Sequence, residues 1–204
     1  MTITLYDYPR SSASFRVRIA LHLAGLTFDT VLVDLLARDH KGADHLARNP
    51  QGLVPVLDID GLRLAQSLAI IEYLNDTRDL DLLPAEAADR ARVRALAYAL
   101  AIDVHPVCNL SVATHATGGQ DQARTDWMRR FIGPGLAAFE VLLDGFEQAP
   151  YCTGTGVSLA DICLIPQLYN ADWWGVDYAG CKRIAGVKTA CLAHLAFQAA
   201  VPQV

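Results

Sequence analysis

The feature that most constrains the fold is a change of hydrophobic periodicity at Leu82-Leu83-Pro84. Before this break, segments with the alternating pattern of strands are interspersed with segments whose apolar residues recur at helical spacing. From Ala87 onward the spacing is helical, and no segment has a convincing strand pattern. The sequence therefore predicts an α/β domain over residues 1–82, followed by an all-helical domain over residues 88–204.

The first domain is predicted to open with a strand, a helix and a strand, and to close with a hairpin and a second helix. Asp60-Gly61 joins two short apolar segments in the manner of a type I′ turn. This order, β-α-β followed by β-β-α, predicts a mixed sheet covered by helices. The predicted strands include 3–6, 28–33 and 54–57, and the predicted helices are 12–23 and 67–78.

The second domain is predicted to contain three long helices, with two short ones near its end. Ser158-Leu159-Ala160-Asp161 fits a variant of the capping box at the start of the third of these helices, and this motif is structural rather than catalytic. The predicted long helices are about 87–111, 123–146 and 158–172.

Composition and charge exclude several classes of function. The chain has 17 basic and 22 acidic side chains, and this net charge of -5 argues against a nucleic-acid partner. No charge-free apolar stretch approaches the ~20 residues of a membrane span. The segment 1–8 lacks the features of a signal peptide. Five scattered cysteines without a C-x-x-C spacing indicate reduced thiols in a cytoplasmic protein, and the histidines show no metal-ligand spacing, so no metal is expected.

The start of the first predicted helix is the first candidate site. A helix that begins at Ser11 or Ser12, directly after a strand, presents unpaired main-chain N–H groups and the positive end of its dipole. Two adjacent hydroxyls there can hydrogen-bond a thiolate or a phosphate, and flanking Arg10 and Arg16 strengthen the positive field. An ordinary serine N-cap explains the same residues and is the simpler interpretation of this segment alone.

Two further segments have a main chain suited to a ligand. Pro55 cannot donate a ladder hydrogen bond, and a cis bond before it would offer the main chain of Val54 to a ligand. A trans proline at a sheet edge is the plainer alternative. Gln66 and Ser67 precede a predicted helix whose N-terminus suits an anion, although N-capping by Ser67 explains them equally well.

The helical part of the chain offers one polar cluster. His105, Asn109 and Ser111 fall within a long predicted helix, and residues four apart share one face, so the three could line a cleft. A lone helical histidine is, however, more often packed or solvated than a ligand. Trp173 and the other tryptophans are interpreted as core or cleft-wall residues rather than as a cofactor motif.

Four motifs occur in order along the chain. They are Ser11-Ser12-Ala13-Ser14-Phe15-Arg16-Val17-Arg18-Ile19-Ala20-Leu21, Asn49-Pro50-Gln51-Gly52-Leu53-Val54-Pro55, Gln66-Ser67-Leu68-Ala69-Ile70-Ile71-Glu72-Tyr73-Leu74 and Asn109-Leu110-Ser111-Val112. Together they resemble the zeta class of the glutathione transferase superfamily, which contains maleylacetoacetate and maleylpyruvate isomerases. The resemblance implies a thioredoxin-like α/β domain joined to an all-α domain, with glutathione bound between them, and a homodimer.

The resemblance also implies roles for the candidate residues, with glutathione as the cofactor and a small molecule as the substrate. The residues implied to contact glutathione are Ser11, Ser12, His40, Val54, Gln66, Ser67, His105, Asn109 and Ser111. Those implied to contact the substrate are Arg10, Arg16, Asn109 and Trp173. Of all these, Ser11, Ser12 and Arg10 are implied to be catalytic.

The implied activity is glutathione-dependent cis/trans isomerisation of an unsaturated carboxylic or dicarboxylic acid from aromatic ring cleavage, by reversible addition of the thiolate to the double bond. A helix N-terminus with hydroxyl donors suits this chemistry, because a thiol with an ordinary pKa of about 8.5 must be made more acidic. One alternative is a glutathione S-transferase or lyase that conjugates or cleaves an electrophilic aromatic-derived substrate. A glutathione-binding protein without catalytic activity is a third interpretation.

Two positions depart from the pattern of the zeta class. Ala13 stands where the class usually has cysteine, which argues against reductive dehalogenation but not against isomerisation. In Asn170-Ala171-Asp172-Trp173-Trp174, Trp173 stands where the isomerases have a second substrate-binding arginine. These departures predict a substrate that is related to, but not identical with, maleylacetoacetate or maleylpyruvate, with a neutral or bulkier group at one end.

Overall fold

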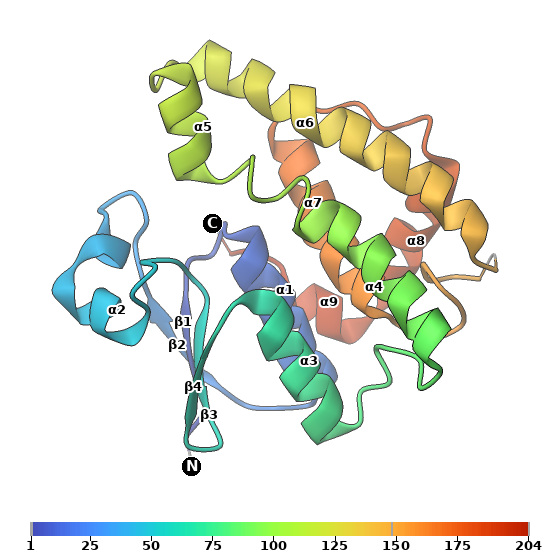
Figure 1. The fold of residues 1–204 in the computed structure, drawn as a ribbon, viewed down its shortest axis with the longest axis horizontal. Coiled ribbons are helices and arrows are strands. Elements are labelled where there is room, and N and C mark those ends of the chain that lie inside the picture. The colour runs from blue at the N-terminus through green and yellow to red at the C-terminus, as the bar shows by residue number, and fades with distance from the viewer. Residues whose placement is uncertain (1, 148, 204) are drawn as a thin grey trace. The chain divides into compact units, whose positions relative to one another are not determined.

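The computed structural model describes residues 2–147 and 149–203, which pack into two units (Figure 1). The first unit runs from the N-terminal strand to Leu80 and also includes the segment that begins at Leu195. The second unit runs from Asp81 to His194. The first is an α/β unit and the described part of the second contains helices but no strand, so the predicted fold class is confirmed.

A four-stranded mixed sheet forms the centre of the first unit. The strands are β1 (Thr4–Asp7), β2 (Asp29–Leu32), β3 (Val56–Ile59) and β4 (Leu62–Ala65), in the spatial order β2-β1-β3-β4. Strand β1 pairs in parallel with β2 and antiparallel with β3, and β3 pairs antiparallel with β4. Asp60 (φ 53°) and Gly61 (φ 79°) both have positive φ in the β3-β4 turn, as the predicted type I′ geometry requires.

Helices cover both faces of this sheet. In Figure 1, α1 and α3 lie on one side of the sheet and α2 lies on the other. The helices are α1 (Ser12–Leu23), α2 (Ala43–Arg48) and α3 (Ser67–Arg78), and a short 3-10 turn, η1 (Asp39–Lys41), precedes α2. Every residue from Ala13 to Leu21 is buried, because α1 packs against α3 as well as α9 (Leu195–Ala200). The core of the unit therefore surrounds α1.

The C-terminal segment belongs to the first unit, whereas the sequence assigned it to the helical domain. Helix α9 packs on α1, and Arg18 Nε donates a hydrogen bond of 3.0 Å to the carbonyl oxygen of Ala200. The remaining donors of this buried guanidinium reach both carboxylate oxygens of Asp7, at 2.7 and 2.9 Å, and the carbonyl oxygen of Pro9 at 2.9 Å. A buried arginine needs acceptors for its donors, and the C-terminal segment supplies one of them.

The second unit is built around α7, which is buried along most of its length. Helix α7 packs against α4, α6 and α8. Its N-terminus forms the predicted capping box. The Ser158 side chain accepts a hydrogen bond from the main-chain N–H of Asp161, and the Asp161 carboxylate accepts hydrogen bonds from the main-chain N–H and the hydroxyl of Ser158. The helices of the unit are α4 (Ala87–Ala101), α5 (Leu110–Thr117), α6 (Asp121–Leu142), α7 (Leu159–Trp173) and α8 (Lys182–Ala193), with a 3-10 turn η2 (Leu143–Gly145) after α6.

The predicted single helix over residues 87–111 is wrong. Helix α4 ends at Ala101, a turn segment follows, and α5 begins after Asn109. Pro106 has no N–H to donate and its ring clashes with the carbonyl four residues earlier, so it disfavours a continuous helix. Asn109 then acts as the N-cap of α5 through a hydrogen bond of 3.1 Å from Ser111 N.

None of the helices in the described residues combines the length and the apolar character needed to cross a membrane.

Candidate active site

The register of the sheet brings three of the predicted ligand-binding segments to one end of the first unit. Tyr6 of β1 is paired with Val56 of β3, and Val56 is paired with Ala65 of β4. The chain leaves β1 towards α1, enters β3 after Val54-Pro55, and leaves β4 towards Gln66. Because antiparallel neighbours run in opposite directions, the end of β1, the start of β3 and the end of β4 lie at the same edge.

The N-terminus of α1 carries the two predicted hydroxyls. Ser11 is the N-cap, and its Oγ accepts a hydrogen bond of 3.2 Å from Ser14 N. This bond uses a lone pair of the hydroxyl and leaves its proton to be donated to a second partner. Ser12 is the first helical residue. The N-cap interpretation and the anion-site interpretation are therefore compatible, since one hydroxyl can serve both purposes.

The two arginines predicted to flank this helix start differ in their environment. Arg10 lies in the turn between β1 and α1 and is half-buried. Arg16 lies within α1 and is only 3% exposed. Arg10 is therefore next to the helix start and partly accessible, whereas Arg16 contributes positive charge from inside the unit.

The peptide bond between Val54 and Pro55 is cis. The trans proline that the residues alone favoured is therefore wrong, and the cis form implied by the family resemblance is present. Strand β3 begins only at Val56. Within the described part of the chain, no hydrogen bond joins the N–H or the carbonyl of Val54 to another residue. This main chain is thus open to pair with an extended ligand.

The start of α3 differs from the capping predicted for it. Gln66, not Ser67, is the N-cap residue, and it has a positive φ of 71° and no side-chain cap bond. Ser67 is the first helical residue and is buried. The side-chain amide of Gln66 donates a hydrogen bond of 2.8 Å to Oε1 of Gln51, which connects the α3 start to the loop before Val54.

His40 lies against the same loop. Its carbonyl oxygen is 2.7 Å from the place where a Cβ would stand on Gly52, which has a φ of +59°. Burial lowers the pKa of His40, and the positive charges of Lys41 and Arg38 lower it further. Its imidazole is therefore neutral near pH 7. His45 of α2 is buried beside this loop, and no motif in the sequence predicts that position.

The remaining predicted residues lie in the second unit. His105 lies in the turn segment after α4, and Asn109 caps α5, so the prediction that they share one helix face is wrong. Ser111 Oγ donates a hydrogen bond of 3.0 Å to Oδ1 of Asn109. Trp173 is the last residue of α7 and is 51% exposed, so it is not a core residue.

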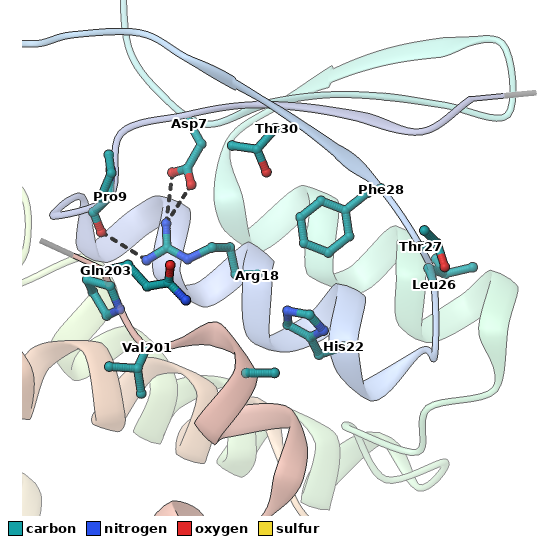
Figure 2. Close-up of a pocket in the computed structure, with 12 residues that line it drawn as sticks. Asp7, Pro9, Arg18, His22, Leu26, Thr27, Phe28, Thr30, Val201 and Gln203 are labelled. Atoms are coloured by element: carbon teal, nitrogen blue, oxygen red, sulfur yellow. Dashed lines mark hydrogen bonds and ion pairs between the residues drawn. The ribbon is translucent and has the colours of Figure 1, made fainter.

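A pocket of about 530 Å³ in the first unit contains none of the predicted site residues. Figure 2 shows Arg18 in this pocket, bound to Asp7 and to the carbonyl of Pro9, with His22 and Phe28 further along the wall. Burial and the charge of Arg18 lower the pKa of His22. The donors of Arg18 are already occupied by the protein, which indicates that this pocket is part of the packing of the C-terminal segment.

The first unit has a mixed sheet with a helix N-terminus and a cis proline at one edge, and a helical unit follows it in the chain. This combination defines a protein of the glutathione transferase class. The chain belongs to the glutathione S-transferase family and to its zeta class. Residues 1–76 match the family model described as glutathione S-transferase, N-terminal domain.

Close relatives cover nearly the whole chain. A maleylacetoacetate isomerase of Rhizobium meliloti (strain 1021) is 57% identical over 97% of this chain and 95% of its own length. The holo structure of a zeta-class maleylpyruvate isomerase has a TM-score of 0.93 and 37% identity, covering 98% of this chain and 96% of that chain. A maleylacetoacetate isomerase from Anaeromyxobacter dehalogenans 2CP-1, with GSH bound in its active site, has a TM-score of 0.87 and 40% identity, covering 98% of this chain and 95% of that chain.

Proposed function

We propose that the chain is a glutathione-dependent cis/trans isomerase of an unsaturated dicarboxylic acid of the maleylacetoacetate type, formed by cleavage of an aromatic ring. Identity of 57% over 97% of the chain to a maleylacetoacetate isomerase supports the reaction. The observation that carries the glutathione part is the unpaired main chain of Val54, which lies at the same sheet edge as the N-termini of α1 and α3.

The residues at this edge fit a tripeptide with an anionic sulfur. Val54 can pair with the peptide main chain through its N–H and carbonyl, as in the addition of a strand to a sheet edge. Gln66 and Ser67 stand at the N-terminus of the twelve-residue helix α3, which suits the carboxylate of the γ-glutamyl group. His40, and from the helical unit His105, Asn109 and Ser111, are the further residues that we assign to glutathione binding.

Bound glutathione supplies the thiol sulfur that adds reversibly to the double bond of the substrate and is regenerated at the end of each turnover. The task of Ser11 and Ser12 is to hold the negative charge of this sulfur. Ser11 can donate its hydroxyl proton while its oxygen caps α1, and the positive end of the helix dipole favours the anion at the same place. Both effects increase the fraction of thiolate at neutral pH.

Arg10 is assigned to a carboxylate of the substrate and to the negative charge that develops during the reaction. Its position in the chain, next to the N-cap of α1, supports this assignment. Arg16 contributes to the same positive field from its buried position in α1. Asn109 and Trp173 are assigned to the substrate from the helical unit, and Trp173 offers an exposed aromatic surface instead of a second cation.

The deciding experiment is to incubate the purified protein with maleylacetoacetate or maleylpyruvate, with and without a catalytic amount of glutathione. We expect proton NMR to show the trans isomer only when glutathione is present, and glutathione to be recovered intact. Accumulation of a glutathione adduct in stoichiometric amount would refute isomerisation. Comparing each diacid with its monoester tests whether Trp173 selects a neutral group at the far end.

Ala13 and Trp173 also support a second candidate, a transferase or lyase that acts on an electrophilic aromatic-derived substrate. These two positions depart from the zeta pattern at the helix that holds the sulfur and at the far end of the substrate. Consumption of glutathione into a conjugate would favour this candidate. Binding of glutathione without any turnover would favour a binding protein.

We further infer a cytoplasmic homodimer. The free state of all five cysteines supports a reducing compartment, and the zeta-class resemblance supports the dimer. Light scattering of the purified chain measures the assembly directly, and a monomer at micromolar concentration would refute this inference.

A further inference from the structure

The carbonyl oxygen of Leu53, immediately before the proposed glutathione contact, accepts hydrogen bonds from two buried side chains. His45 Nε2 lies 3.0 Å from this oxygen and Asn49 Nδ2 lies 2.9 Å from it. His45 is 2% exposed and Asn49 is 4% exposed. Leu53 itself has an exposed side chain, so two buried polar side chains bind the main chain of a surface residue.

The contact requires a proton on Nε2 of His45. A carbonyl oxygen can only accept, so Nε2 must be the donor. Nδ1 is buried and has no hydrogen-bond partner among the described residues. A buried ring nitrogen without a partner costs stability, so packing alone does not favour a histidine here. The hydrogen bond to Leu53 is the one hydrogen bond that the described residues provide for this side chain.

The loop that ends at Leu53 is braced at several other points. Asn49 uses its Oδ1 to accept a hydrogen bond of 3.1 Å from Gln51 N. Lys41 Nζ donates to the carbonyl oxygen of Gly52 at 3.2 Å, and Gly52 lies too close to the His40 carbonyl for any side chain to fit. His45 is therefore one of the groups that define the position of the last peptide of this loop.

That last peptide contains both the carbonyl of Leu53 and the N–H of Val54. The peptide is planar and trans, so its carbonyl and its N–H point in opposite directions. Because His45 and Asn49 hold the Leu53 oxygen towards α2, the Val54 N–H points away from α2. No described residue accepts a hydrogen bond from this N–H. Hydrogen bonding at the carbonyl also polarises the peptide and strengthens its N–H as a donor.

We propose that His45 is a positioning residue, which orients the Leu53–Val54 peptide so that the Val54 N–H is presented to the main chain of glutathione. This inference rests on the proposed function, because it takes glutathione as the ligand of Val54. In this proposal His45 does not contact the ligand; it affects binding only by fixing the orientation of the Leu53–Val54 peptide.

The test compares three variants of the full-length protein. His45→Phe keeps a planar ring but removes the donor. His45→Gln places an amide donor near the position of Nε2, whereas His45→Asn places it near Nδ1, too far from Leu53. Asn49 still holds the oxygen in each variant, so loss of one hydrogen bond is expected to raise the Kd for glutathione about fivefold in His45→Phe and His45→Asn. His45→Gln is expected to restore binding to within about twofold of the wild type.

Two further measurements separate positioning from general stability. The loss in His45→Phe should fall mainly on KM for glutathione rather than on kcat. In the free protein, the amide nitrogen resonance of Val54 should move in His45→Phe and return in His45→Gln, since this nitrogen shares its peptide with the Leu53 carbonyl. A long-range proton–nitrogen spectrum should show the proton of His45 on Nε2.

The outcomes distinguish this inference from the proposed function. Equal glutathione affinity in the wild type and His45→Phe overturns the inference alone. A His45→Gln variant that binds as weakly as His45→Phe also overturns it, because packing and not the hydrogen bond would then be responsible. Failure of the wild-type protein to bind glutathione overturns the proposed function, and the inference with it.

Discussion

Ser11 combines a structural and a chemical task in one hydroxyl, and substitutions can separate them. Ser11→Ala removes both the cap on Ser14 N and the proton offered to an anion. Ser11→Asp keeps an acceptor for the cap but places a negative charge where the thiolate is proposed to lie. The two variants should therefore rank in opposite orders for stability and for activity.

The magnitudes follow from the geometry at the helix start. The cap bond is 3.2 Å long and partly buried, so Ser11→Ala should lower the free energy of unfolding by about 1 kcal/mol. Aspartate is as good a cap as serine and interacts favourably with the helix dipole, so Ser11→Asp should be at least as stable as the wild type to within about 0.3 kcal/mol. A hydrogen bond to a charged group contributes about 1.5–3 kcal/mol, so Ser11→Ala should reduce turnover at neutral pH by tenfold or more.

Urea unfolding measures the ranking of stability. The ultraviolet absorbance of the bound thiolate and the isomerisation rate measure the ranking of activity. We expect the wild type and Ser11→Asp to be more stable than Ser11→Ala, and Ser11→Asp to be the least active. Glu86→Ala is a matched control, because Glu86 caps α4 through Ala88 N and Asp89 N outside the proposed site. This control should lose stability and keep its activity. If activity simply followed stability across the series, Ser11 would be a cap only and the assignment of the sulfur site would be wrong.

Three further predictions concern the two units separately. Arg18→Met leaves the buried carboxylate of Asp7 without its partner and should lower the free energy of unfolding by about 3 kcal/mol, measured in urea, with faster hydrogen exchange in the C-terminal segment; unchanged exchange there would contradict the role of Arg18. Asp161→Asn replaces an acceptor of main-chain and hydroxyl donors by an amide and should destabilise the protein by about 3 kcal/mol in thermal unfolding. Burial raises the pKa of Cys108 to about 12, so almost none of this thiol is ionised at pH 7 to 9; a maleimide reagent should modify the more exposed Cys181 first and reach Cys108 only on unfolding, as peptide mass spectrometry would show.

The features that the sequence predicted correctly depend on neighbours along the chain. The type I′ turn at Asp60-Gly61 follows from two residues that tolerate positive φ. The cap at Ser11 and the capping box at Ser158 follow from side chains that reach the main chain within three residues. The change from mixed to helical periodicity likewise requires no knowledge of tertiary contacts. Such signals come from residues close together in the sequence, so they do not depend on contacts with distant segments.

Local signals failed where two tendencies competed within a short segment. Helical spacing extended across Pro106, but the missing N–H and the cap at Asn109 end one helix and begin another. Ser67 has a side chain suited to an N-cap, yet Gln66 takes that place with a positive φ. The cis bond before Pro55 was implied only by the family resemblance, because isolated X-Pro bonds favour trans.

The sequence by itself thus determined the two-part organisation, the turns and most helix starts, since these depend on the residues within a few positions. Only the tertiary structure decided which distant segments meet. Sheet register brings the start of β3 to the same edge as the N-termini of α1 and α3. Arg18 binds the carbonyl of Ala200, 182 residues away, and His45 is buried against Leu53. These contacts satisfy buried donors whose partners cannot be read from spacing, because any of many polar groups along the chain could have met the same need.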